Sequence, residues 1–505
     1  MILFPSGSRV SVRLLAVAAA VVGLLMAPAP GAAQQLTGPS ALTLREAVQL
    51  ASENNPRFLQ QQNEIGVARS TVRSARGNLL PSARASSTLG YTASGERRFE
   101  SVGLGTQPAI YGSDYLVGLN YSVSGATLLQ PSVERSRLTA TERRVVGAAA
   151  ELERQVADQY LTVLQAREQI AQSERELGRT GEHVRLANAR LEVGAGTPLD
   201  VRRAEVQQGR AEIGLVQARN RAATAVLVLS QLIGVQLGED VALTSEFTIF
   251  DPEWSSASLV EMALQNNPAL LAARAGSSAA GTAVSAARSS YLPTVSMNMG
   301  WRGSVYQAGN IDPLIAEGME GLQRSFGACL NQNEIRTRVG LAPADCLNPA
   351  DPAVSEALRA NIARQNSGFP FGYDRQPLSA SLTVSLPLFT GFTRQLEVDR
   401  ARAAAADAGY QVRAEELRLQ QEVGTAVRNL ETAHQTVSLQ ERVRANAAEE
   451  LRLARERFRF GAANSVEVTD AQTNLAQSEK ELIDAVYDFH KSLAALEALV
   501  GQSLR

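Results

Sequence analysis

The sequence predicts a mainly α-helical chain with a membrane β-barrel portion, built from a duplicated unit of helix, strand, strand and long helical hairpin. Three observations predict this class: an internal repeat, segments of about ten residues with alternating polarity, and helical runs of about 60 residues without proline. The composition agrees with long helices, because aromatic residues make up only 5% of the 505 residues and apolar residues 45%.

The N-terminus is predicted to be a secretory signal peptide over residues 1–33. Arg9 and Arg13 precede an apolar run and then a stretch of alanine, proline and glycine. An uncleaved anchor is the less favoured alternative, because the run is short for a membrane span. No cysteine lies near residue 33, so no N-terminal lipidation is expected. No later apolar run reaches about 18 residues, so a mature chain that enters a membrane must do so through β-strands.

An internal repeat indicates that one long unit is duplicated. The segment Asn54-Asn55-Pro56 recurs as Asn266-Asn267-Pro268 at an offset of 212, and Val193-Gly194-Ala195 recurs as Phe460-Gly461-Ala462 at an offset of 267. Because the offset grows by 55 between these pairs, the second copy carries an insertion in its middle. A period above 200 residues excludes a solenoid.

The repeat also predicts the domain organisation, with a first structural repeat at residues 34–250 and a second at residues 251–505. Each repeat opens with a helix, expected over residues 44–78 and over residues 259–290. Both helices are expected to end at a Leu-Pro pair, because proline cannot continue the helical hydrogen-bond ladder.

Two strands are predicted after the first helix of each repeat. Apolar residues alternate with small or polar ones over Val295–Trp301, over residues 115–124 and over residues 378–386. A period of two over about ten residues is what a membrane-barrel strand requires. A water-soluble sheet with one buried face is the alternative. The signal peptide and the nearby aromatic residues favour the membrane.

Four strands in one chain cannot close a membrane barrel, because the smallest barrels have about eight strands and an open edge is not tolerated in lipid. Several chains must therefore contribute to one barrel. Two, three or four chains would supply about 8, 12 or 16 strands, and only a barrel of more than about eight strands leaves an open lumen.

Long helical hairpins complete the repeats. Proline is absent from Ser132 to Thr197 and from every position after Pro387. Apolar residues in these runs recur in steps of three and four, which is typical of a coiled-coil seam. The helices of each pair meet at turns that contain Gly194 and Gly461, where glycine ends one helix and a following Thr or Asn can cap the next.

These motifs, in this order and twice over, resemble the TolC-type outer membrane efflux proteins, also called outer membrane factors. The resemblance runs from about Leu42 to Leu504 and includes Pro387-Leu388-Phe389-Thr390-Gly391. It implies a homotrimer with a 12-stranded β-barrel in outer membrane lipid and a periplasmic α-helical barrel. It also implies the duct of a tripartite efflux or type I secretion system. That duct would dock on a periplasmic adaptor (membrane fusion) protein and an inner-membrane pump of the RND or ABC type.

The second copy departs from the first by a long loop between its strands, at about residues 302–377, which is expected at the outer face. This loop holds the two cysteines, Cys329 and Cys346, which can pair as a disulfide in an exported chain. A cysteine-based metal site is the weaker alternative, because the three histidines show no ligand spacing. In the first copy, Leu128-Leu129-Gln130-Pro131 stands where the resemblance implies Pro-Leu-Phe-x-Gly.

The hairpin turns are predicted to dock on the adaptor, on the strength of the resemblance. They carry small residues and place an apolar side chain beside an acid at the end of a long hairpin. The alternative is that they only reverse the chain. The predicted contact residues are Gly194, Pro198, Leu199, Val201, Gly461, Val466 and Val468.

An acidic gate is predicted just after the second turn. Glu467 and Asp470 are three residues apart, so they share one helix face. The resemblance places them, with Asp200 of the first copy, around a closed periplasmic aperture, where the carboxylates of three chains would attract cations. Phe458 and Ala463 occupy the family's Tyr and Arg latch positions, so Asp200 is expected to lack its usual partners. The alternative is that these acids only stabilise the start of their helix, because negative charge is favourable near a helix N-terminus.

Several other function classes are disfavoured. The 49 basic and 51 acidic residues leave no positive excess for nucleic acid. Nucleophile-elbow, P-loop, HExxH and dinucleotide motifs are absent, so no enzyme, cofactor or metal site is predicted. The alternative function is a non-transporting cell-envelope coiled coil or adhesin, against which the symmetric amphipathic strands argue.

Overall fold

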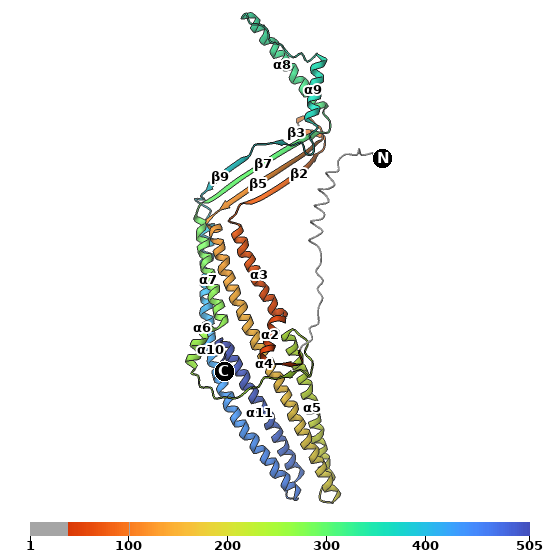
Figure 1. Cartoon of the computed structure of the whole chain (residues 1–505), viewed down its shortest axis with the longest axis vertical. Coiled ribbons are helices and arrows are strands. Elements are labelled where there is room, and N and C mark those ends of the chain that lie inside the picture. Colours follow the sequence, from red (N-terminus) through yellow and green to blue (C-terminus); the bar gives the residue numbers. More distant parts are fainter. Residues whose placement is uncertain (1–38, 100–101, 505) are drawn as a thin grey trace, which may run out of the picture. The chain divides into compact units, whose positions relative to one another are not determined.

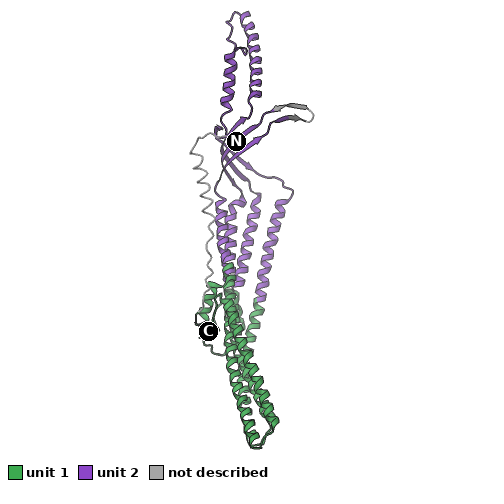
Figure 2. Ribbon diagram, turned by 90° about the vertical axis from the view of Figure 1, so that its right-hand side faces the viewer, with its two compact units in different colours: residues 1–61, 148–267, 419–505 green, residues 62–147, 268–418 purple. Residues whose placement is uncertain are grey.

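The computed structural model describes residues 39–99 and 102–504, so the predicted signal peptide lies outside the described residues. The chain divides into two compact units (Figure 2). Unit 1 takes residues 1–61, 148–267 and 419–505, and unit 2 takes residues 62–147 and 268–418. Each unit combines segments from both sequence repeats, so the compact units do not coincide with the repeats.

An antiparallel sheet forms the centre of unit 2. Its strands follow the order β2 (Ser82–Thr92), β5 (Ile110–Val123), β7 (Thr294–Ala308) and β9 (Ser379–Ser385), with the short β8 (Asp374–Arg375) beside β7 (Figure 1). The predicted two strands per repeat are thereby confirmed, although β7 continues seven residues beyond the predicted end at Trp301. Within the described residues, β2 pairs only with β5 and β9 only with β7, so each leaves one edge unpaired.

Further elements of unit 2 connect the strands of this sheet or lead into them. A hairpin of β3 (Gly95–Phe99) and β4 (Val102–Gln107) connects β2 to β5. The helix α7 (Pro268–Arg288) and the short η1 (Ser289–Tyr291) lead into β7. None of the helices formed by the described residues is long and apolar enough to cross a lipid bilayer.

Unit 1 consists mainly of two helical hairpins. The first joins α4 (Gly125–Glu192) to α5 (Pro198–Ile233), and the second joins α10 (Thr393–Arg459) to α11 (Ser465–Val500). The helices α4 and α10 begin in unit 2 and enter unit 1 at about residues 148 and 419. The predicted seams are confirmed, because most of their apolar residues are buried, among them Val156, Tyr160, Val163, Val423, Val427, Leu430, Val437, Phe489, Leu493, Leu496 and Val500.

Polar side chains also connect the two hairpins of unit 1. Arg179 on α4 forms two hydrogen bonds, of 3.1 and 2.7 Å, with Glu479 on α11, and both side chains are less than 20% exposed. Asp484 accepts hydrogen bonds of 2.8 Å from the side-chain amides of Gln165 and Gln169. Partly buried, charge-assisted bonds of this kind fix the register of α4 against α11 more specifically than apolar packing alone.

The opening helix of each repeat is broken, which corrects the prediction of one continuous helix. The first forms α2 (Leu44–Asn54) and α3 (Pro56–Gly77), and the second forms α6 (Ser256–Asn266) and α7. Asn55 and Asn267, between the two parts, have extended ψ angles of 117° and 122°. The proline that follows each of them disfavours the helical conformation at the preceding residue.

The broken helices are tied to the ends of the hairpins. The amide of Asn55 donates to the carbonyl oxygen of Leu232 at 2.8 Å, and that of Asn267 donates to Leu499 at 2.9 Å. Next to these carbonyls, Gly234 ends α5 and Gly501 ends α11, both with φ near 76°. A Cβ at Gly234 would lie 2.3 Å from the carbonyl oxygen of Asn54, so only glycine fits this joint.

We expect that replacing Asn55 with alanine destabilises unit 1 by about 1–3 kcal/mol, because the partly buried carbonyl of Leu232 would lose its hydrogen-bond partner. Asn267→Ala should have a similar effect at the second joint. Thermal unfolding followed by circular dichroism measures this. Asn188→Ala is the matched control, since the exposed Asn188 amide bonds only within its own helix, and an equal loss in that variant would contradict the role of the joints.

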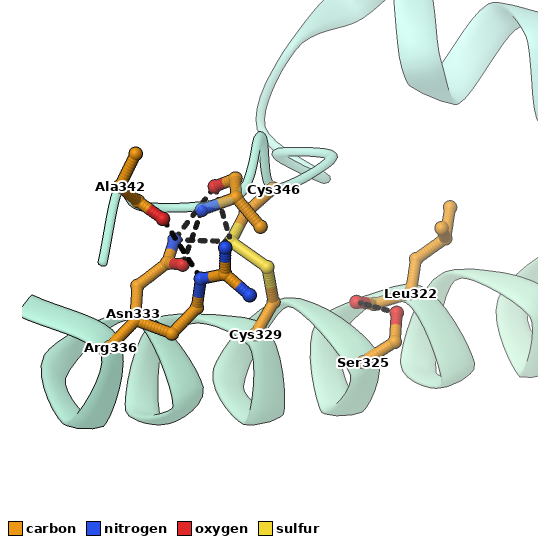
Figure 3. The surroundings of a disulfide bond; sticks show 8 residues. Leu322, Ser325, Cys329, Asn333, Arg336, Ala342 and Cys346 are labelled. Carbon is orange, nitrogen blue, oxygen red and sulfur yellow. Dashed lines mark hydrogen bonds between the residues drawn. A yellow bond between two sulfur atoms is a disulfide. The ribbon is translucent and has the colours of Figure 1, made fainter. Parts of the chain in front are cut away.

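The predicted loop at residues 302–377 is largely helical. It contains α8 (Asp312–Arg338) and α9 (Pro352–Gln365), which pack on each other with Leu358 and Ile362 of α9 beside Gly318. Cys329 on α8 is bonded to Cys346, at a sequence separation of 17 (Figure 3). Asn333 exchanges two hydrogen bonds, of 2.8 and 2.7 Å, with the backbone of Ala344, and so holds the same segment.

Replacing both cysteines with alanine should release the segment after α8. Chain entropy predicts a local loss of about 3 kcal/mol for a loop of this length. Limited proteolysis should then cut the variant between α8 and α9 at least about ten times faster than the wild type, since 1.4 kcal/mol corresponds to a factor of ten. Two free thiols in the purified protein, detected by maleimide labelling under denaturing conditions, would contradict the disulfide.

Candidate functional site

The sheet of unit 2 has one apolar and one polar face. Alternate residues of a strand share a face. Most side chains therefore lie opposite side chains of like character, although Ser87 and Ser113 fall on the apolar face and Leu116 and Tyr306 on the polar face. Thus Ala85 opposes Val117, which opposes Trp301, whereas Ser82 opposes Asn120, which opposes Asn298. The apolar face comprises Ala83, Ala85, Leu89, Tyr91, Tyr111, Tyr115, Val117, Leu119, Tyr121, Val123, Val295, Met297, Met299, Trp301, Ala380, Leu382 and Val384.

This apolar face is open to solvent in the single chain. Val117, Leu382 and Leu89 are 45%, 68% and 67% exposed. A contiguous exposed apolar surface of this kind marks an interaction with another protein or with a membrane. Its strands are 7 to 15 residues long, and most reach the length that spans a bilayer as a tilted strand.

Aromatic rings lie at both ends of the strands. At the end near α8, Tyr111 packs on Tyr91 and on Phe369, with ring centroids 5.1 and 5.8 Å apart, and Tyr115 packs on Tyr373 at 4.8 Å. At the opposite end, after β9, the exposed rings of Phe389 and Phe392 lie 5.6 Å apart. Two aromatic belts that flank an apolar band are typical of strands in a membrane.

The second part of the candidate site is the pair of hairpin turns in unit 1. Both turns have the same geometry, in which glycine adopts a left-handed conformation with φ of 72° at Gly194 and 76° at Gly461. An arginine closes each turn, because Arg190 donates to the carbonyl oxygen of Ala195 and Arg457 donates to that of Ala462. Thr197 and Asn464 cap the following helices, as expected.

The structure separates the predicted contact residues into two groups. Gly194, Pro198, Leu199, Gly461 and Val466 are at the surface, with Leu199 56% and Val466 38% exposed. Val193 and Phe460, which are about 80% exposed and occupy equivalent positions in the two repeats, were missed although both are apolar and next to the turn glycine.

The prediction that Val201 and Val468 contact a partner is wrong. Val201 packs with Ala187 and Ala204, and Val468 is fully buried with Phe458 and Leu475 among its neighbours. Each valine lies three residues before a buried alanine of its helix, so it belongs to the stripe that faces the hairpin interior.

The three predicted gate acids have different surroundings. Asp200 accepts hydrogen bonds from the backbone and hydroxyl of Thr197, at 3.1 and 2.7 Å, so it caps its own helix. Glu467, at the equivalent position, forms an ion pair of 3.0 Å with Arg457 across the turn. Asp470 is exposed, and no ion pair or hydrogen bond of its carboxylate is found within the described residues. The repeat offset of 267 relates Arg457 to Arg190, so the sequence by itself shows an arginine at the same position before each turn.

The predicted latch position Phe458 connects the two hairpins by packing. Its buried ring lies under the guanidinium of Arg190, with 4.4 Å between the Arg190 Cζ and the ring centroid. The buried imidazole of His183 on α4 lies 5.5 Å from the same ring. Burial, reinforced by the charge of Arg455, lowers the pKa of His183, so this imidazole is neutral at neutral pH. The contact is therefore apolar and cation–π in character, without the hydrogen bonds of a tyrosine latch.

Comparison with known proteins assigns these features to a family. The family model described as "Outer membrane efflux protein" matches residues 47–235 and 330–502, which is well over half of the chain. The chain belongs to the outer membrane efflux protein family. This outer membrane efflux protein is a channel protein, as the sequence predicted, and its location is the outer membrane. The family consists of channels, not enzymes.

Individual relatives agree with this assignment. The outer membrane protein TolC of Vibrio cholerae is 23% identical over 91% of this chain and 91% of its own length. The outer membrane efflux protein BepC of Brucella suis is 32% identical, over 34% of this chain and 36% of its own. Among solved structures, the VceC outer membrane protein of Vibrio cholerae superposes with a TM-score of 0.65 at 16% identity, covering 92% of this chain and 97% of VceC. The predicted fold class is thereby confirmed.

Proposed function

We propose that three copies of this efflux protein form one duct, with a 12-stranded barrel in outer membrane lipid and the helical hairpins in the periplasm. The observation that carries the proposal is the sheet, whose register gathers apolar residues on one face and polar residues on the other while β2 and β9 each keep an unpaired edge. Open edges are not tolerated in lipid, so neighbouring copies would pair β9 with β2.

The hairpin turns are proposed to dock on a periplasmic adaptor protein, which in turn meets an inner-membrane pump of the RND or ABC type. Their support is the exposed apolar set at the two turns, formed by Val193, Leu199, Phe460 and Val466. The acids Glu467 and Asp470 are proposed to lie around the periplasmic opening. A tripartite efflux or type I secretion system would use this duct to carry its cargo to the outside.

The size of the detergent-extracted protein tests the proposed trimer. The mature protein, extracted from outer membranes, should run as a trimer in native mass spectrometry and dissociate to a monomer on heating. Carbonate washing should leave it in the membrane, whereas an adhesin rod without a barrel would be released. A stable monomer with full strand content by spectroscopy would contradict the proposal.

The two faces of the sheet provide a second test. Val117→Arg should prevent accumulation of the trimer in the outer membrane, because a cation at mid-depth of the lipid-facing side costs about 2–4 kcal/mol in each copy. Asn298→Arg, which places the same side chain on the polar face, is the matched control and should assemble normally. Equal tolerance of both substitutions, measured from the heat-dissociable trimer in membrane fractions, would show that the apolar face does not contact lipid.

A further inference from the structure

The polar face of the sheet contains a groove with two arginines. Arg84 on β2 and Arg302 on β7 lie on either side of it, and its volume is about 350 Å³. Ionisable side chains within membrane strands are costly unless they face water or protein, so their presence is a sign of function. The proposed function does not by itself account for these two residues.

Strand register explains why the arginines share one groove. Arg84 is opposite Gly118 on β5, Gly118 is opposite Gly300 on β7, and Arg302 follows two residues later on the same face. Two strand spacings across the sheet and two residues along β7 put the backbones of the two arginines about 12 Å apart, a distance that two long side chains can span toward a common ligand. Gly118 and Gly300 leave the row beside Arg84 without side chains, whereas Leu116, which is opposite Arg302 on the same face, lines the groove.

The lining of the groove supplies hydrogen-bond donors without negative charge. Besides the two arginines it contains the carboxamides of Asn120 and Asn298 and the hydroxyls of Ser379 and Ser381. Within the described part of the chain, neither guanidinium has a carboxylate or carbonyl partner. Guanidinium groups match carboxylate and phosphate oxygens in geometry and charge, so the donor set fits an anion.

Carboxylates do occur on this face, but outside the groove. Asp114 on β5 and Asp374 on β8 are both opposite Ser304 of β7, one step along the strands beyond Arg302. They therefore bound the positive groove on the side of α8 and do not line it. Two residues of strand, about 7 Å, separate the position of Arg302 from the row of Asp114 and Asp374. An anion bound between the arginines would therefore lie away from these carboxylates.

We propose that Arg84 and Arg302 form an anion-binding site on the duct wall, which takes the carboxylate, phosphate or sulfonate group of a passing solute. The proposal rests on the proposed function in one respect, namely that the polar face lines the lumen. A trimer would place three such grooves, with six arginines, around one lumen. The site would retain anionic solutes in the barrel, whereas the acids near the hairpin turns would act on cations.

Single-channel recording of the full-length trimer in planar bilayers, in about 0.1 M KCl where charges about 10 Å apart are only partly screened, tests the site. Inorganic pyrophosphate should block the wild-type current in a voltage-dependent way. The Arg84→Gln and Arg302→Gln double variant should need about tenfold more pyrophosphate for half block, in line with the loss of charge-assisted hydrogen bonds. Arg84→Lys with Arg302→Lys should keep most of the block, because the charge remains.

Arg359→Gln is the matched control, since it removes one exposed positive charge from α9, outside the sheet. It should leave the block unchanged. The inference is overturned if pyrophosphate does not block the wild type, if the double glutamine variant is blocked as strongly as the wild type, or if Arg359→Gln weakens the block equally. Failure of the purified trimer to conduct at all would instead contradict the proposed function, and the inference with it.

Discussion

Replacing Leu199 and Val466 together with aspartate should abolish export while leaving the level of outer membrane trimer unchanged. Both side chains are exposed next to the hairpin turns, so they add little to the stability of unit 1. The two aspartates would place two buried carboxylates per copy in the proposed adaptor interface. Each uncompensated buried charge costs several kcal/mol. Efflux of a fluorescent dye from cells that carry the adaptor and pump measures the effect, with an expected fall to background.

Leu199→Met with Val466→Ile is the matched control, because these changes keep the apolar character and approximate volume. It should export normally. A bulky residue at Gly194 or Gly461 should also reduce export, with an added strain of about 1–2 kcal/mol because both glycines have positive φ. Normal dye efflux by the aspartate variant, at wild-type trimer levels, would show that the turns only reverse the chain.

Replacing Glu467 and Asp470 with alanine should make the channel less cation-selective and weaken its block by multivalent cations. Removal of six carboxylates from one opening is expected to raise the half-blocking concentration of a trivalent cation about tenfold, which corresponds to about 1.4 kcal/mol. Planar-bilayer recording at low salt measures both properties.

The structure also predicts how the effects of the single substitutions on cation selectivity rank. Asp470→Ala should have the larger effect, because Arg457 already neutralises part of the charge of Glu467 through its ion pair of 3.0 Å. Arg457→Gln is the converse test and should increase cation selectivity. Asp200→Ala should change selectivity least, since this carboxylate is held by Thr197 as a helix cap. If the glutamate and aspartate variants match the wild type in both selectivity and block, the acids do not line the opening.

Two features that the sequence prediction got wrong could have been predicted from local patterns in the chain. The broken opening helices were readable at Asn55-Pro56 and Asn267-Pro268, because proline restricts the residue before it regardless of tertiary context. The burial of Val201 and Val468 was also readable, since each is in phase with a buried stripe that continues through Ala204 and Ala471. The first error came from disregarding the proline inside each segment, and the second from not following the helical phase of the turn residues.

The insertion between β7 and β9 was only partly predictable. Its position followed from the change in repeat offset, and the pairing of Cys329 with Cys346 was one of two alternatives open to the sequence. The helices α8 and α9 were not predicted, although Asp312-Pro313 and Asp351-Pro352 are helix-start signals that could have shown them.

By itself the sequence determined the duplicated order of elements, the strands with alternating faces and the glycine turns, because period, proline and glycine act on the local backbone. Tertiary structure alone decided which side chains meet across these elements. It places Phe458 under Arg190 and brings Arg84 and Arg302 to one groove. Such contacts depend on strand register and helix packing between segments up to about 270 residues apart in the chain, and no local pattern encodes those distances.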